Sequence, residues 1–469
     1  MSKYQKITER FIEALKLVLP EAQILAQKEV LAAYSHDETE DLSFLPELVL
    51  KPETTEQVAN IAKLCFDFNI PMTPQGARTG LSGGALPIFG GVALSLEKLN
   101  TILEIDTDNL QVTVQPGVIV QELQETVAKL GLFYPPDPSS KGSCFIGGNI
   151  AENAGGPKAV KYGVTKDYVL NLEVVLADGT VIWTGANVLK NATGYNLTQL
   201  IVGSEGTLGI VTKAVLKLIP LPKYDRLLLV PFNKLENATK AVAAIFKAGI
   251  TPSGLEFMER DAIDWTIAFM GESQINIEPT VAAHLLIEVD GNNESVLMSD
   301  LEQILTVVEG FECGEVLFAE DQSQKDKLWQ IRRKVGEAVK SQSVYKEEDT
   351  VVPRYYLPEL LLGVKAIGAK YGFKSVCYGH AGDGNLHINI IKGNLSDQFW
   401  NETLTKAIED IFNLTVKLGG TISGEHGIGY VQKNYMTIPF NGVQLKLMQQ
   451  IKNIFDPKGL LNPGKIFPD

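Results

Sequence analysis

Three polar segments rich in glycine constrain the first half of this chain more than any other feature. They cover residues 75–84, 135–156 and 203–210, and the first follows a predicted short strand. Glycine lets the backbone approach a ligand closely and offers N–H groups to phosphate oxygens. Each segment alone is as readily an ordinary turn, but three in one domain predict the walls of a long dinucleotide cleft. None has the spacing of a GxGxxG fingerprint or a P-loop.

The pattern of strands and helices changes at the proline pair Pro220 and Pro222. A helical arm (residues 1–45) and a domain of short strands and helices (46–222) come before it. Residues 223–469 then alternate strand, helix and strand, which predicts an antiparallel sheet with helices on one face. We therefore expect an α+β protein with two large domains, for which 469 residues are ample.

Two histidine segments stand out in the second domain. His380 and His387 lie in a stretch punctuated by glycines, and His426 follows Glu425 in a Gly-Glu-His-Gly sequence. Two imidazoles and one carboxylate match the ligands of a divalent ion such as zinc, manganese or iron. A further imidazole beside them is a candidate base.

Less specific interpretations apply to single residues. His380 alone would more often be a structural histidine in a turn; His284, in an apolar strand, fits the core, and His36, near Asp37, fits the surface. Three arginines are candidates to bind an anionic substrate, because a guanidinium pairs with a carboxylate in bidentate fashion. They are Arg332, Arg333 and Arg354, and for Arg333 a solvated helix face is the favoured interpretation.

Composition excludes several classes of partner. The formal net charge of -14 argues against nucleic acid and anionic membrane surfaces. The four cysteines are far apart and predict neither a disulfide framework nor a cysteine metal site. No stretch reaches 18 apolar residues, and the N-terminus does not read as a signal or transit peptide. These features together predict a cytoplasmic protein without a membrane span.

The three loops resemble the flavin domain of the vanillyl-alcohol oxidase superfamily, the PCMH-type FAD domain. Together with the His-x6-His stretch, the Gly-Glu-His-Gly motif and the terminal Leu-Asn-Pro-Gly-Lys, they are most similar to one branch of it. This branch contains glycolate oxidase catalytic subunits, D-lactate dehydrogenases and D-2-hydroxyglutarate dehydrogenases. The resemblance covers residues from about 42 to 465.

The resemblance implies that FAD lies along the three loops. Residues 76–80 and 83 would hold its pyrophosphate, and the second loop would line the ribityl chain and isoalloxazine. The cofactor-binding residues expected on this basis are Pro74, Gly76, Ala77, Arg78, Thr79, Gly80, Gly83, Pro135, Asp137, Ser139, Gly147, Gly148, Asn149, Asn153, Ala154, Gly155, Ile210 and Asn462. Relatives with covalent flavin carry a histidine in the first loop, and this chain has none there, so we expect non-covalent FAD.

The resemblance also implies the chemistry of the histidine segments. His380, His387 and Glu425 would bind the divalent metal, and His426 would take the hydroxyl proton of a D-2-hydroxy acid while its hydride passes to flavin. Arg332 matches a carboxylate-binding arginine, and Asn385 would hold the substrate or support the metal ligands. Some hydroxyglutarate-specific relatives carry a hydroxyl residue four positions after this arginine. Here the residue is Gly336.

Glycolate or D-lactate is therefore the favoured substrate, and D-2-hydroxyglutarate the alternative. A non-catalytic flavoprotein subunit and a flavin-dependent alkyl or acyl transferase are the competing functions. The chain has no cysteine cluster for iron and sulfur, so electrons must leave to an external acceptor. A quinone, an electron-transfer flavoprotein or an iron–sulfur subunit would serve, and a homodimer is a further assembly to consider.

Overall fold

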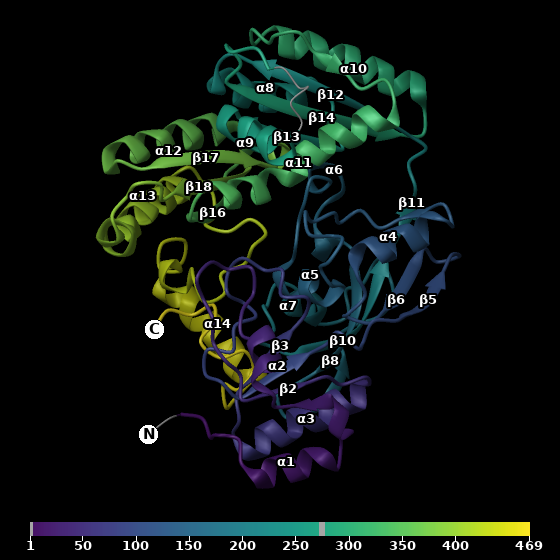
Figure 1. Ribbon diagram of the computed structural model, residues 1–469. Coiled ribbons are helices and arrows are strands. Elements are labelled where there is room, and N and C mark those ends of the chain that lie inside the picture. Colours follow the sequence, from purple (N-terminus) through teal and green to yellow (C-terminus); the bar gives the residue numbers. More distant parts are fainter. Residues whose placement is uncertain (1–2, 272–276) are drawn as a thin grey trace. The chain divides into compact units, whose positions relative to one another are not determined.

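The computed structural model describes residues 3–271 and 277–469, and these residues form two compact units (Figure 1). The first unit combines Met1–Ala154, Val164–Leu221 and Glu425–Asp469. The second combines Gly155–Gly163 with Pro222–Gly424. Each unit is thus built from segments that are distant in the sequence.

A small sheet in the first unit has the strand order β1-β2-β4-β3, and β2 and β3 both run parallel to β4. Its strands are β1 (Ile24–Leu25), β2 (Leu48–Leu50), β3 (Met72–Gln75) and β4 (Val92–Ser95). The helices near it in sequence are α1 (Glu9–Lys16), α2 (Lys28–Ala33) and α3 (Thr55–Phe68). Helix α3 begins where the Thr54 hydroxyl accepts a hydrogen bond from the Gln57 N–H, and it buries Val58 and Ile61 in the core with Phe11 of α1.

A second, antiparallel sheet of the first unit has the order β5-β6-β10-β8-β9. Its strands are β5 (Ile102–Asp106), β6 (Gln111–Val114), β8 (Val169–Val175), β9 (Val181–Trp183) and β10 (Ile210–Lys217). A further pair joins β7 (Leu132–Phe133) to β11 (Ile219–Pro220). The helices of this part are α4 (Val120–Ala128), α5 (Ile146–Glu152), α7 (Leu197–Ile201) and α14 (Gly442–Phe455).

The second unit is organised around a seven-stranded antiparallel sheet of order β15-β12-β14-β13-β17-β18-β16. Its strands are β12 (Tyr224–Phe232), β13 (Gly254–Glu259), β14 (Ala283–Gly291), β15 (Leu317–Phe318), β16 (Tyr345–Val351), β17 (Lys374–Gly379) and β18 (Asn385–Ile391). Its helices are α6 (Ala159–Tyr162), α8 (Leu235–Lys247), α9 (Arg260–Met270), α10 (Glu294–Glu309), α11 (Gln322–Gln342), α12 (Leu357–Tyr371) and α13 (Leu404–Lys417).

Helices cover both faces of this large sheet, so the prediction of helices on one face only was wrong. Helices α9 and α11 share a core with Leu286, Met258 and Tyr378, which lie on one face. Helices α8, α10 and α12 pack on the other. The reason is visible in β13, whose six residues are all buried, as expected for a strand covered on two sides.

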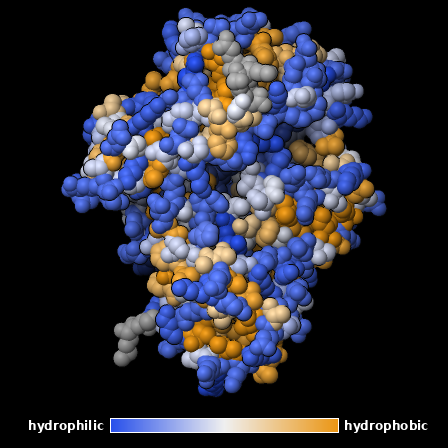
Figure 2. Space-filling model, viewed as in Figure 1, coloured by the Kyte–Doolittle hydropathy of each residue, from blue (hydrophilic) through white to orange (hydrophobic). Residues whose placement is uncertain are grey.

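The mixture of helices and sheets expected of an α+β protein and the antiparallel sheet of the second unit are confirmed. Within the described ranges, every helix is too short or too polar to cross a bilayer. Hydrophilic residues predominate on the face shown in Figure 2. Exposed apolar side chains also occur, and Val443, Leu447 and Ile454 of α14 are examples.

Candidate active site

One face of the seven-stranded sheet carries a group of buried polar side chains. Alternate residues of a strand point to the same face. The core residue that each strand places under α9 and α11 therefore identifies the residues two, four or six positions away that share its face. Met258, Tyr378, Ile391 and Tyr345 are such core residues. By this alternation the same face receives the side chains of Glu256, His380, Asn385, His387, Asn389, Glu347 and Asp349.

Strand pairing brings these residues together. His387 of β18 lies opposite Asp349 of β16 and opposite Tyr378 of β17, and Met258 of β13 lies opposite Tyr378. Four neighbouring strands therefore supply the group, and backbone hydrogen bonds fix the register between them.

Glu256 joins one predicted metal ligand to the predicted substrate arginine. Its carboxylate oxygens lie 2.9 and 2.8 Å from His380 Nδ1, and Oε2 lies 2.7 Å from Arg332 Nε. The side chains of Glu256, Arg332 and His380 are 0%, 4% and 5% exposed. Burial opposes ionisation of this carboxyl, but His380 and Arg332 outweigh that effect and hold the pKa of Glu256 below its usual value.

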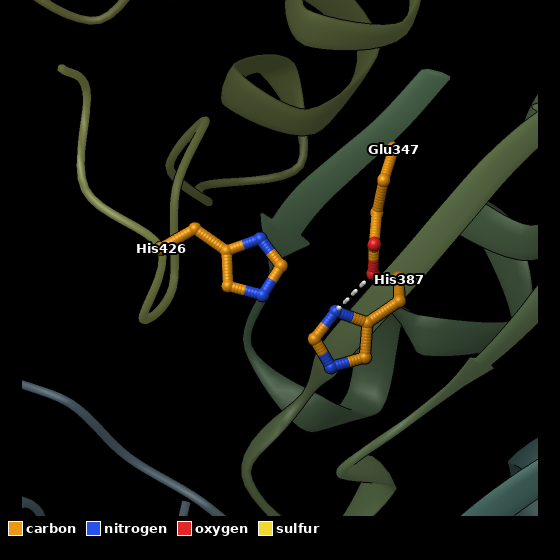
Figure 3. Close-up of side chains that lie close together, drawn as sticks. All are labelled: Glu347, His387 and His426. Atoms are coloured by element: carbon orange, nitrogen blue, oxygen red, sulfur yellow. Dashed lines mark ion pairs between the residues drawn. The ribbon is translucent and has the colours of Figure 1, made fainter. Parts of the chain in front are cut away.

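His387 faces two carboxylates on β16. Its Nδ1 lies 3.2 Å from Glu347 Oε1, as drawn in Figure 3, and 3.7 Å from Asp349 Oδ1. The rings of His380 and His387 are 5.5 Å apart and nearly perpendicular. A histidine that binds a metal commonly donates its other ring N–H to a carboxylate, so both imidazoles have the surroundings expected of ligands.

Asn385 is bound within the same network. Its amide nitrogen donates to Asp349 Oδ1 at 2.6 Å, and Asp349 Oδ2 accepts the backbone N–H of Gly424 at 2.8 Å. Asp349 therefore binds both Asn385 and Gly424. Gly424 is the last residue of the second unit and directly precedes Glu425 and His426 in the sequence.

The other candidates lie elsewhere. Arg354 stacks on Phe246 and Arg333 on Trp329, so of the three arginines Arg332 is the one on the polar face. His284 is buried in β14 and His36 is exposed, which confirms the core and surface interpretations.

Sequence reasoning missed Glu256, Glu347, Asp349 and Asn389. Each occupies a strand, and Asp349 and Asn389 are 0% exposed. A charged residue at a position that strand alternation buries needs a partner, because an unpaired charge in the interior is costly. That rule, applied to Glu256 in the apolar run Gly254–Glu259, was the available signal.

In the first unit, the structure brings the predicted flavin loops together. A Cβ on Gly76 would lie 3.6 Å from the backbone nitrogen of Gly148, which joins the first loop to the second. A Cβ on Gly203 would lie 3.5 Å from that of Asn153, and one on Gly206 would lie 3.7 Å from Pro74. Asn462 donates to the carbonyl oxygens of Gly84 and Glu205, each at 2.8 Å.

These loops suit a flavin dinucleotide. Four segments approach one another through glycines and one asparagine, which leaves backbone groups to face a ligand. The Ser82 hydroxyl is buried and lacks a hydrogen-bond partner among the described residues. Arg78 adopts a positive φ of 60° and stacks on Tyr34 at 4.2 Å. Ile210 is buried in the core, and Gly155 begins the segment that belongs to the second unit.

Glu425 and His426 begin the C-terminal segment of the first unit. Ile428 and Gly429, which follow them, donate their backbone N–H groups to the Glu205 carboxylate at 2.8 and 2.6 Å. The Gly-Glu-His-Gly sequence thus leads into the C-terminal segment of the first unit.

Comparison with known families identifies both halves of the chain. Residues 221–466 match the family described as FAD linked oxidases, C-terminal domain, and residues 46–185 match the FAD binding domain. Among curated proteins, the chain is 40% identical to a D-lactate dehydrogenase of Anaerostipes hadrus, with 99% of each chain covered. It is 39% identical to the glycolate oxidase subunit GlcD of Bacillus subtilis (strain 168), with 92% of each covered.

A solved structure of p-cresol methylhydroxylase shares the fold, with a TM-score of 0.82, 17% identity, and coverage of 99% of this chain and 98% of that one. The matches to the family models and to these relatives extend over nearly the whole sequence. The chain therefore belongs to the FAD-linked oxidase family, and its cofactor is FAD.

Proposed function

We propose that this enzyme oxidises a short D-2-hydroxy acid, with glycolate or D-lactate favoured, to the corresponding 2-oxo acid. The observation that carries the proposal is the buried group formed by Glu256, His380 and Arg332, with His387 beside it. It combines a site for a cation with a guanidinium, which suits a substrate that has a hydroxyl next to a carboxylate. The names of the D-lactate dehydrogenase and glycolate oxidase relatives support the same class.

In this proposal each residue has a defined part. His380 and His387 bind a divalent ion through Nε2, since a carboxylate lies against Nδ1 of each ring, and Glu425 is the third ligand. Arg332 orients the substrate carboxylate through its Nη groups, because its Nε is paired with Glu256. Asn385 supports the network through Asp349. His426 takes the hydroxyl proton as the C2 hydrogen leaves with its electron pair.

FAD, when bound, supplies the acceptor for that hydride. Its binding is proposed to be non-covalent, because residues 75–84 contain no histidine. The chain carries no cysteine cluster for iron and sulfur, so the electrons are proposed to leave to a quinone, an electron-transfer flavoprotein or an iron–sulfur subunit.

The test is anaerobic bleaching of the bound flavin, followed at about 450 nm, where oxidised flavins absorb. D- and L-2-hydroxy acids are added singly, with and without prior chelation. Bleaching by glycolate or D-lactate that chelation abolishes is the expected result. Bleaching only by D-2-hydroxyglutarate would change the substrate, and bleaching by no acid would favour a transferase or an electron-carrying subunit.

A further inference from the structure

One buried carboxylate in the first unit holds the loop that follows His426. Glu205 comes from the third glycine-rich segment and is 6% exposed. Its Oε1 accepts the N–H of Ile428 at 2.8 Å, and its Oε2 accepts the N–H of Gly429 at 2.6 Å. Hydrogen bonds to an ionised acceptor are stronger than neutral ones, and two from adjacent residues fix both the position and the direction of the backbone.

Glu205 is itself rigidly placed. Its backbone has a positive φ of 52°, its N–H donates to Ala151 at 2.8 Å, and its carbonyl accepts the amide of Asn462 at 2.8 Å. Asn462 in turn accepts a hydrogen bond from Lys465 at 3.0 Å. Because the backbone of Glu205 is held at these points, its carboxylate can fix the position of the loop that follows His426.

The loop that follows His426 lies close against other segments of the first unit and requires glycine at two positions. Gly427 and Gly429 have φ of 78° and 52°, in the left-handed region that favours glycine. A Cβ on Gly427 would collide with the Glu152 carboxylate, and one on Gly429 would collide with the Ser82 carbonyl oxygen. The same Ser82 oxygen accepts the N–H of Tyr430 at 2.9 Å.

The charges around Glu205 favour its role as acceptor. Burial and the neighbouring charges of Glu205 and Asp37 raise the pKa of Glu152 well above its usual range. Burial raises the pKa of Glu205 too, but the N–H groups of Ile428 and Gly429 and the charge of Lys465 oppose that rise. Of the two acids, Glu152 therefore keeps its proton more firmly than Glu205.

We propose that Glu205 is a positioning residue for the reaction, whose carboxylate holds residues 427–429 so that His426 stays where it takes the substrate proton. This inference rests on the function proposed above. It assigns to the flavin-binding unit a second task besides holding FAD, which is to place the base.

The experiment compares Glu205→Gln with Glu173→Gln. Glu173 is a matched control, because it is also buried in the first unit and bonded to Thr55, Thr212 and Lys213, far in sequence from the His426 loop. FAD content is measured first, and stopped-flow reduction is then reported per bound flavin across a substrate series and a pH series. Glu205→Gln puts an amide nitrogen against a backbone N–H, so we expect the limiting reduction rate to fall about 10- to 100-fold.

Three further readings identify the cause. The substrate concentration at half-maximal rate should change less than about 3-fold, because uniform binding is not altered. The pH profile of the limiting rate should shift in Glu205→Gln and stay in place in Glu173→Gln. Glu205→Asp, which keeps a carboxylate on a shorter chain, should recover part of the rate.

An unchanged rate per bound flavin in Glu205→Gln overturns the proposal, and so does a Glu205→Asp rate no higher than that of Glu205→Gln. Failure of both variants to retain FAD also overturns it, since the role would then be structural. His426→Ala separates this inference from the proposed function. If His426→Ala reduces flavin at the wild-type rate, the assignment of the base is wrong. If His426→Ala is slow but the Glu205 variants reduce flavin at the wild-type rate, His426 remains the base and only the positioning role of Glu205 is wrong.

Discussion

Removing the Glu256 carboxylate should destabilise the second unit more than removing one partner of an exposed ion pair. Glu256 is 0% exposed and lies 2.7 Å from the guanidinium of Arg332, which is 4% exposed. Breaking a buried pair from one side costs about 3–5 kcal/mol, because the remaining charge stays in the interior without its counter-ion. Glu256→Ala should therefore lower the free energy of unfolding by about that amount.

The matched control is Asp410→Ala. Asp410 pairs with Lys370 at 2.7 Å in the same unit, but these side chains are 39% and 62% exposed. Exposed pairs contribute at most about 1 kcal/mol, so the two alanine variants should differ several-fold in their effect.

Urea unfolding followed by tryptophan fluorescence measures this difference. Trp265, Trp329 and Trp400 belong to the second unit and Trp183 to the first, so the signal reports mainly on the unit that contains Glu256. A double variant that adds Arg332→Met should be less destabilised than the sum of the single changes, because it removes the stranded charge. A cost for Glu256→Ala no larger than for Asp410→Ala, or strict additivity with Arg332→Met, would refute the reasoning.

Other changes have equally definite outcomes. Burial lowers the pKa of His284 from 6.5 to about 4, so the folded state favours its neutral form. The protein should therefore lose roughly 3 kcal/mol of stability as pH falls from 7 to 4. Urea unfolding at both pH values should show that His284→Asn lacks this loss. His387→Ala should lower bound divalent metal, measured by elemental analysis, at least about 10-fold, with FAD content unchanged. Gly384→Ala should unfold at lower temperature by calorimetry and lose about 1 kcal/mol or more, since Gly384 has φ of 84° and its Cβ would collide with the Val352 carbonyl oxygen.

Much of the fold follows from local signals in the sequence. The spacing of apolar residues predicts α3, whose structure runs from Thr55 to Phe68 and buries Val58, Ile61, Ala62 and Cys65. Glycine spacing also identified the loops that meet near Gly76 and Gly148. The helix and each separate loop depend on residues that are close together in the sequence, whereas the contact between the loops does not.

The rest depends on contacts between distant segments, which local patterns do not encode. Residues 155–163 follow a flavin loop in the sequence yet belong to the second unit, where Lys161 pairs with Asp290 at 2.5 Å and Lys158 with Glu288. Helices α9 and α11 are far apart in the sequence yet share one core on one face of the large sheet, and α8, α10 and α12 pack on the other face. The hydrophobic periodicity of the separate segments does not reveal either of these contacts.

The polar face of the second unit shows why its histidines were easier to single out from the sequence than the acids beside them. Histidine is scarce in this chain, so two of them within eight residues attract notice. Glutamate and aspartate are common, and Glu256 and Asp349 differ from surface acids by their burial, which both residues share at 0% exposure. Once that burial is known, charge pairing requires partners for both, and His380, Arg332 and Asn385 provide them. The carboxylates that pair with these histidines and with Arg332 can therefore be derived from burial and strand register together, and from neither alone.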